Sequence, residues 1–328
     1  MKNVFRLLFL INLIFLGTFS GLRAQVSPWG TGVINNQNIG QLTSPLAVFP
    51  SNTNYGVFGT DVAIGAFPHP DNLLNAYTYD IYIPTSYDGT EPYGLVTFIN
   101  SGNNGGLISS WAQVLEEKKL ILIAGDNIGN SINANIRNGV AWAAIHRIKE
   151  VLNVDTDRIY TSGNSGGGRM SSVLAYIYPE WIKGSVPNCG ASYLRQVDQD
   201  YENQNPNSHY EYTYPFTSAE MNYVQTFDQR MGIMTAYDDF REGDIMNIYH
   251  NGMVEDGFKG KFLEISGSHC STSSAHFRDA INYIEHPFIT FVNDSMDNSL
   301  ATVGDGFDVR NSSIQNSKMV LQHSGLQK

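Results

Sequence analysis

The chain has 328 residues, of which 42% are hydrophobic. It can therefore bury the core of one large α/β domain or of two small ones. Its formal net charge is −11, from 31 acidic and 20 basic residues. This balance argues against nucleic acid or another polyanion as a partner.

The first residues predict a cleavable secretory signal over 1–24. Lys2 and Arg6 precede an apolar run that ends in small residues and in Leu22-Arg23-Ala24, which is the layout of such a signal. An uncleaved membrane anchor is the alternative, but it needs a longer apolar run. No later segment is apolar enough to span a bilayer. We therefore expect a secreted or periplasmic protein.

The rest of the chain divides by composition into three parts. Residues 25–75 are rich in Asn, Gly, Ser and Pro without steady periodicity, which predicts an irregular leader. Residues 76–287 carry the regular patterns, and 288–328 are expected to be a loosely attached tail. There is no internal repeat and no domain linker.

Strand and helix patterns alternate between residues 76 and 287. Short apolar runs bounded by Gly and polar residues are typical of buried parallel strands, and apolar residues at helical spacing lie between them. This order predicts an α/β fold, with a mostly parallel sheet and helices on both faces. Strands are expected at 76–84, 94–100, 119–125, 157–163, 182–190, 230–236 and 260–266, and helices at 138–154, 166–178, 243–258 and 275–286.

One segment, 191–229, interrupts this alternation. It is polar and Asn-rich and carries six tyrosines, namely Tyr193, Tyr201, Tyr210, Tyr212, Tyr214 and Tyr223. A long insertion in a compact domain is usually a lid or a binding loop. Tyrosine rings and amides suit a polar substrate that bears a ring. The alternative is that the tyrosines pack the insertion itself.

Ser165 is the candidate nucleophile. The sequence Gly163-Asn164-Ser165-Gly166-Gly167 lies where a predicted strand runs directly into a predicted helix. A nucleophile elbow requires this junction, and glycines on both sides of the serine leave room for the sharp turn. The pentapeptide alone would be weak evidence, because it also arises by chance in Gly-rich turns.

A serine needs a histidine to take its proton and a carboxylate to orient that histidine. In this topology the acid and the histidine follow the serine in the sequence, at strand ends. Asp239 follows the strand at 230–236, and His269 follows the strand at 260–266. Asp238 is the alternative acid, and His276, inside a helical pattern, is the alternative base.

Backbone N–H groups are expected to form an oxyanion hole. Gly166 offers one at the start of a helix. The second should come from the loop 100–106, NSGNNGG, where Gly102 is the candidate and a flexible turn is the alternative. The other histidines show no metal-ligand spacing, so neither a metal nor an organic cofactor is expected.

Cys189 and Cys270 are the two cysteines of the chain, and both lie beyond the signal. Cys270 directly follows the proposed base, and Cys189 follows the strand after the elbow helix. Export to an oxidising compartment would allow a disulfide between them that pins the histidine loop to the sheet. Two buried thiols are the alternative.

These segments resemble the α/β-hydrolase superfamily, and within it secreted esterases similar to polyhydroxybutyrate depolymerases and to feruloyl or acetyl-xylan esterases. The resemblance covers roughly residues 76–287 and is most specific from Asp155 to Gly167. There, an Asp-x-x-Arg-Ile-Tyr strand leads into G-x-S-x-G-G. Two departures are the loop NSGNNGG, where related sites often carry His-Gly-Gly, and the tyrosine-rich insertion.

The resemblance implies an esterase in which Ser165 is the nucleophile, Asp239 the acid and His269 the base. The polar insertion favours a small-molecule or polysaccharide ester substrate, with acetyl or feruloyl groups on carbohydrate. A polyester depolymerase and a peptidase are alternatives within the fold. A glycan-binding protein with an inactive hydrolase fold is the alternative from another class. The sequence gives no oligomeric state.

Overall fold

A computed structural model describes residues 25–43, 70–197, 216–286, 313–315 and 318–320. The predicted signal and most of the predicted tail lie outside these residues. Within the described part, the chain contains no helix with the length and apolar character that a membrane span requires. The short strands β9 (Ser313–Gln315) and β10 (Lys318–Val320) pair antiparallel within the tail.

An eight-stranded sheet runs through the described domain in the order β1-β2-β4-β3-β5-β6-β7-β8. Strand β2 pairs antiparallel with both β1 and β4, and every other pair is parallel. The strands are β1 (Gly32–Gln37), β2 (Tyr79–Ile83), β3 (Tyr93–Ile99), β4 (Leu120–Gly125), β5 (Val154–Asn164), β6 (Gly184–Asn188), β7 (Arg230–Ala236) and β8 (Lys259–Ile265).

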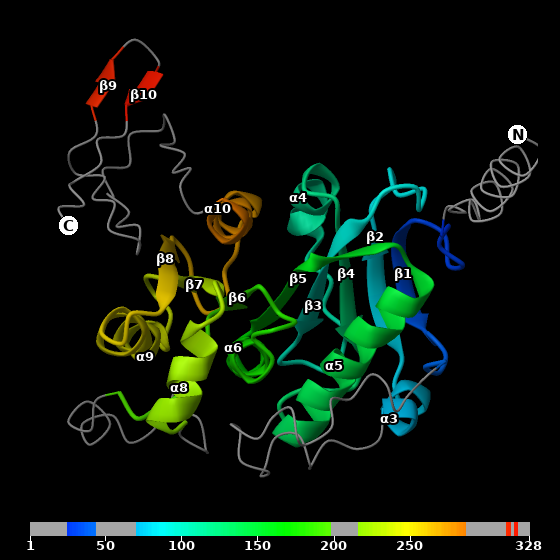
Figure 1. Cartoon of the computed structure of the whole chain (residues 1–328), viewed down its shortest axis with the longest axis horizontal. Coiled ribbons are helices and arrows are strands. Elements are labelled where there is room, and N and C mark those ends of the chain that lie inside the picture. Colours follow the sequence, from blue (N-terminus) through cyan, green and yellow to red (C-terminus); the bar gives the residue numbers. More distant parts are fainter. Residues whose placement is uncertain (1–24, 44–69, 198–215, 287–312, 316–317, 321–328) are drawn as a thin grey trace, which may run out of the picture.

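Helices cover both faces of the sheet, which confirms the predicted α/β class (Figure 1). On one face lie α4 (Ala112–Glu117), preceded by the 3₁₀ turn η2 (Ser109–Trp111), and α10 (Ser274–Glu285). On the other lie α5 (Ala134–Val151), α6 (Gly166–Ile177), α8 (Ser218–Gln225) and α9 (Glu242–Asn247), and α3 (Pro70–Ala76) packs against α5. The helix predicted at 243–258 is α9 continued by the π-helix η3 (Ile248–Val254).

The core has two layers because the sheet is covered on both faces. Strands β3, β4 and β7 are buried along their whole length, as the apolar runs at 94–100 and 119–125 predict for β3 and β4. On the α4 and α10 face, the ring of Trp111 stacks on Phe277 at 3.9 Å between centroids. On the α5 and α6 face, Trp142 stacks on Tyr178 at 3.7 Å.

Strand β1, helix α3 and helix α8 lie where the sequence predicts irregular structure or a long insertion. Strand β1 falls within 25–75, and its side chains are exposed or half-buried, so backbone pairing with β2 holds it. Helix α8 falls within the insertion and begins with a capping box between Thr217 and Glu220.

The tyrosines of the insertion have different settings. Tyr201, Tyr210, Tyr212 and Tyr214 lie outside the described residues. Tyr193 is fully buried, and its hydroxyl donates to Asp256 at 2.8 Å. Tyr193 therefore packs the domain.

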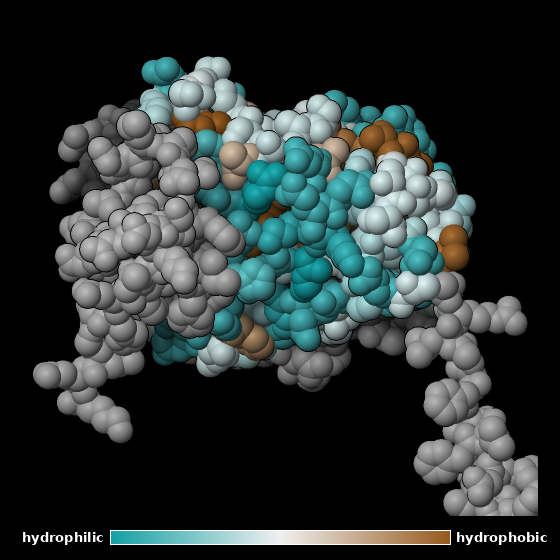
Figure 2. Space-filling model, turned by 90° about the horizontal axis from the view of Figure 1, so that it is seen from above, coloured by the Kyte–Doolittle hydropathy of each residue, from teal (hydrophilic) through white to brown (hydrophobic). Residues whose placement is uncertain are grey.

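Hydrophilic residues and residues of intermediate hydropathy cover most of the described surface in the view of Figure 2, and apolar residues appear there in separate groups. This distribution fits the two buried layers described above, which hold most of the large apolar side chains.

Candidate active site

The turn between β5 and α6 holds Ser165 in a strained backbone conformation. Ser165 has φ 54° and ψ −119°, a region that residues with a side chain rarely adopt. Its N–H donates to the carbonyl oxygen of Asn188, at the end of β6, over 2.8 Å. This sharp strand-to-helix turn is the geometry of a nucleophile elbow, which exposes the serine side chain at the end of the sheet.

Gly163 and Gly167 allow the elbow to pack against β3. A Cβ on Gly167 would lie 1.8 Å from the carbonyl oxygen of Ile99, and one on Gly163 would lie 2.5 Å from the same oxygen. Any side chain at either position would collide with the main chain of β3. The spacing of glycines around Ser165 therefore has a steric cause.

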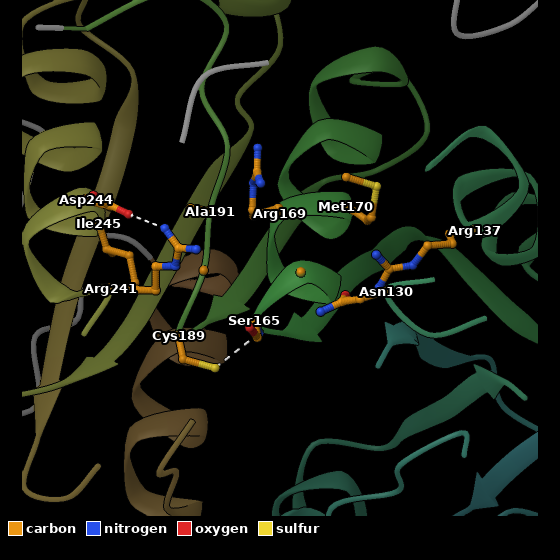
Figure 3. Close-up of a pocket in the computed structure, with 12 residues that line it drawn as sticks. Asn130, Arg137, Ser165, Arg169, Met170, Cys189, Ala191, Arg241, Asp244 and Ile245 are labelled. Carbon is orange, nitrogen blue, oxygen red and sulfur yellow. Dashed lines mark hydrogen bonds and ion pairs between the residues drawn. The ribbon is translucent and has the colours of Figure 1, made fainter. Parts of the chain in front are cut away.

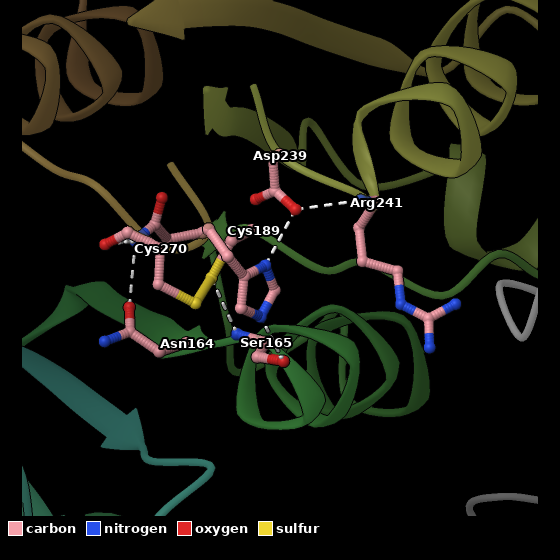
Figure 4. The surroundings of a disulfide bond; sticks show 8 residues. Asn164, Ser165, Cys189, Asp239, Arg241 and Cys270 are labelled. Carbon is pink, nitrogen blue, oxygen red and sulfur yellow. Dashed lines mark hydrogen bonds and ion pairs between the residues drawn. A yellow bond between two sulfur atoms is a disulfide. The ribbon is translucent and has the colours of Figure 1, made fainter. Parts of the chain in front are cut away.

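The structure brings Ser165, His269 and Asp239 together, although they are far apart in the sequence (Figure 4). His269 Nε2 lies 3.0 Å from Ser165 Oγ, and His269 Nδ1 lies 2.7 Å from Asp239 Oδ1. The carboxylate of Asp239 is buried, whereas the His269 side chain keeps 28% of its surface exposed. The main-chain N–H of Arg241 also donates to Asp239 Oδ1, at 2.8 Å.

The alternative residues take other positions. Asp238 is exposed, whereas the neighbouring Asp239 is buried. His276 lies in the first turn of α10, where its Nδ1 is 2.6 Å from the Oγ of Ser273. Burial lowers the pKa of His276. Of the candidate acids and bases in the sequence, Asp239 and His269 are the ones that hydrogen bonds connect to Ser165 in the structure.

A cavity of about 290 Å³ opens beside Ser165 and Gly166 (Figure 3). Asn130 lines it and lies over Gly166, so that a Cβ there would be 2.1 Å from Asn130 Oδ1. Gly102 is not among the described residues that line this cavity. Its loop is braced instead by Asn100, whose Nδ2 donates to the carbonyl oxygen of Asn104 at 3.0 Å. A role for Gly102 in an oxyanion hole therefore stays a prediction.

The sequence does not predict the polar lining of this cavity, to which Asn130, Arg137, Arg169 and Arg241 contribute. Two of these residues have a signal in the sequence. Arg169 follows Ser165 by four residues, which is one helical turn, and Arg241 follows Asp239 by two. Arg137 has no such signal, because only the packing of α5 brings it to the site.

An exposed aromatic side chain lies beside the histidine. Phe240 is 71% exposed, and its ring centroid is 4.3 Å from that of His269. Tyr237, three residues earlier, is also exposed. A ring exposed at this place can contact a bound molecule.

Cys189 and Cys270 form a disulfide beside these residues (Figure 4). Cys270 follows His269, and Cys189 follows Asn188, whose carbonyl oxygen accepts from Ser165. The Ser165 N–H also lies 3.1 Å from Cys189 Sγ. The disulfide therefore ties the histidine loop to the strand end that holds the serine.

We expect this disulfide to contribute strongly to stability, because it joins residues 81 positions apart. For a loop of this length, chain entropy predicts about 4 kcal/mol. The double variant Cys189→Ala, Cys270→Ala should lose about this much free energy of unfolding in urea. Wild type with a reducing agent is the control and should unfold like the variant. Coincident curves for the variant and the oxidised wild type would contradict the expectation.

No family model and no curated protein matches the chain. Among solved structures, it is similar to S-formylglutathione hydrolase (FrmB) from Staphylococcus aureus, with 13% identity and a TM-score of 0.46. For FphF, a fluorophosphonate-binding serine hydrolase of the same organism, the values are 14% and 0.47. Each alignment covers 63% of this chain and 92% of the other.

Est1E from Butyrivibrio proteoclasticus is a third similar structure, with 15% identity and a TM-score of 0.43 over 64% of this chain and 94% of that one. Similarity at this level does not identify the reaction or substrate of this chain. We therefore infer its function from the geometry of its own site.

Proposed function

We propose that this chain is a serine esterase that hydrolyses carboxylic esters through an acyl-enzyme. The observation that carries the proposal is the hydrogen-bonded series from Ser165 Oγ through His269 to Asp239, with distances of 3.0 Å and 2.7 Å. A nucleophile, a base within reach of it and a group that orients the base are the components of this chemistry.

The positions of Ser165, His269 and Asp239 assign each side chain a role in ester hydrolysis. His269 Nε2 takes the proton of Ser165 as the oxygen attacks the ester carbonyl, and then gives that proton to the departing alcohol. A water molecule, activated by the same nitrogen, then cleaves the acyl-enzyme. Asp239 holds the proton on Nδ1 and stabilises the positive charge on the ring. The N–H of Gly166 is at the helix start beside Ser165, where it can donate to the oxyanion.

For the substrate, we infer a carbohydrate-linked ester with an acetyl or feruloyl group. The cavity is lined mainly by charged and amide side chains together with glycine and only a few apolar residues, which suits a polar substrate better than a hydrophobic polyester. The exposed ring of Phe240 beside His269 supplies a surface on which a sugar or a phenolic ring can stack.

We further propose that the mature chain begins near Gln25 and acts outside the cytoplasm. The signal-like sequence before it and the disulfide between Cys189 and Cys270 support this proposal, because disulfides persist in oxidising compartments.

The test combines labelling with turnover. The chain from Gln25 onward should be labelled by a fluorophosphonate at Ser165, as located by peptide mass spectrometry, and should hydrolyse 4-nitrophenyl acetate until it is labelled. Urea-unfolded protein is the control and should take up no label. A folded sample that shows neither labelling nor turnover would refute the esterase and favour a glycan-binding protein. Acetylated and feruloylated glycans compared with a polyester would then test the substrate class.

A further inference from the structure

The cavity beside Ser165 gathers positive charge within a chain whose net charge is −11. Its described lining carries three guanidinium groups, those of Arg137, Arg169 and Arg241, and one carboxylate, that of Asp244 (Figure 3). Arg241 Nη1 pairs with Asp244 Oδ2 at 2.9 Å. The cavity lining thus carries more positive than negative groups, although the whole chain carries a net negative charge.

Arg137 gives the strongest evidence for an anion site, because its positive charge is buried. It is only 4% exposed, and its guanidinium extends from α5 toward Asn130 (Figure 3). Its Nε donates to the carbonyl oxygen of Ile128 at 2.8 Å and its Nη2 to that of Asn100 at 2.9 Å. Within the described ranges, no carboxylate forms an ion pair with it. A buried cation is costly without a counter-charge.

The neighbouring arginines increase this cost. Burial lowers the pKa of Arg137 to about 10, and the positive charge of Arg169 adds to the effect. Burial also lowers the pKa of Arg169, with a further contribution from Arg241 that the carboxylate of Asp244 opposes. Arg169 lies on α6 one turn after Ser165, and its main-chain N–H donates to the Ser165 carbonyl oxygen at 3.1 Å. An anion bound in the cavity would relieve the repulsion between these groups.

We propose that this cavity binds a carboxylate of the substrate, so that the preferred substrate is an ester that also carries a free carboxylate. This inference rests on the proposed esterase function. A guanidinium presents parallel N–H groups that match the two oxygens of a carboxylate. Because Ser165 and Arg137 line the same cavity, the carboxylate lies within a few bonds of the ester. A uronate next to an acylated sugar and a dicarboxylic acyl group both meet this requirement.

Two matched pairs of esters test the proposal and distinguish these two sources. Mono(4-nitrophenyl) glutarate and 4-nitrophenyl pentanoate differ by a carboxylate on the acyl side. 4-Acetoxybenzoate and its methyl ester differ by one on the alcohol side. We expect the charged member of one pair to have a kcat/KM about tenfold higher or more, mainly through KM, as hydrogen bonds to a charged group allow. The pair that shows this preference tells whether the recognised carboxylate lies on the acyl side or on the alcohol side of the ester.

Variants connect the preference to the arginines. Arg137→Gln keeps a side-chain donor for one carbonyl oxygen but removes the charge, and should bring the ratio of charged to neutral kcat/KM close to one. Arg169→Gln serves as the second variant if Arg137→Gln does not fold. Arg278→Gln is the matched control. Arg278 lies on α10 and pairs with Glu117 of α4, so it is on the face of the sheet opposite to α5 and α6. This control should keep the wild-type ratio.

The outcomes separate the two proposals. If neither member of either pair is hydrolysed, the esterase function fails and the inference fails with it. If the neutral esters are hydrolysed as well as the charged ones or better, the esterase stands and carboxylate recognition is wrong. The same holds if the wild-type preference survives in both Arg137→Gln and Arg169→Gln.

Discussion

Replacing Ser165 with alanine should lower kcat for 4-nitrophenyl acetate by roughly 10⁴-fold or more, because no other group takes over the attack on the carbonyl. The Ser165 hydroxyl is the group 3.0 Å from His269 Nε2. Alanine at this position removes one oxygen atom and leaves the strained turn otherwise intact. The measurement is steady-state hydrolysis with protein prepared free of wild-type chain.

Ser162→Ala is the matched control for this variant. Ser162 lies on the same strand, β5, and its hydroxyl donates to the carbonyl oxygen of Val186 at 2.6 Å. Its loss should cost about 1 kcal/mol of stability and leave kcat within a few-fold of wild type. If Ser165→Ala retained a tenth of the wild-type kcat, Ser165 would not be the nucleophile.

The sequence predicts the inner strands of the sheet well, because each buried strand is encoded by a run of consecutive apolar residues. The runs that become β3, β4 and β7 are mostly apolar, and the structure buries them completely. The elbow is also local, since the glycines around Ser165 reflect a close approach to β3 that only a residue without a side chain permits. Asp239 and His269 come after the parallel strands β7 and β8. Because the carboxyl ends of parallel strands lie at the same edge of the sheet, the sequence also predicts that these residues lie near Ser165.

The sequence does not predict strand β1 or helix α8, because both lie in polar segments. Strand β1 has a polar sequence, and its pairing with β2 uses backbone groups that leave no hydrophobic pattern. Helix α8 lies within a polar insertion, where its capping box is its main local signal.

The cavity lining escapes prediction for a related reason. The apolar residues of α5 recur at helical spacing, so its other residues are expected to face solvent. The structure places α5 against the sheet and also against α3 and α6. Arg137, Asn138 and His146 are buried there as a result. A polar residue on a helix with several neighbours has no sequence pattern that distinguishes it from an exposed one, so the place of Arg137 in the site emerges only from the fold.

Replacing Asp239 with alanine should lower kcat by roughly 10⁴-fold, since loss of the acid leaves His269 without orientation or charge stabilisation. Asp238→Ala is the matched control, because Asp238 is exposed and adjacent in the sequence. It should stay within a few-fold of wild type. Equal losses in the two variants would contradict the assignment of Asp239 as the acid.

Asp239→Asn then separates orientation from charge. The Arg241 N–H donates to Asp239 Oδ1, the same oxygen that His269 Nδ1 contacts. This donor should hold the amide oxygen of asparagine at the Oδ1 position, because the amide nitrogen cannot accept from it. His269 would then keep its hydrogen bond and tautomer and lose only the negative charge beside it.

We therefore expect kcat to fall in the order wild type, Asp239→Asn, Asp239→Ala, with KM for 4-nitrophenyl acetate little changed. Steady-state kinetics of the three proteins, after unfolding curves show that each is folded, checks this order. An Asp239→Asn variant as impaired as Asp239→Ala would mean that the Arg241 N–H does not fix the amide.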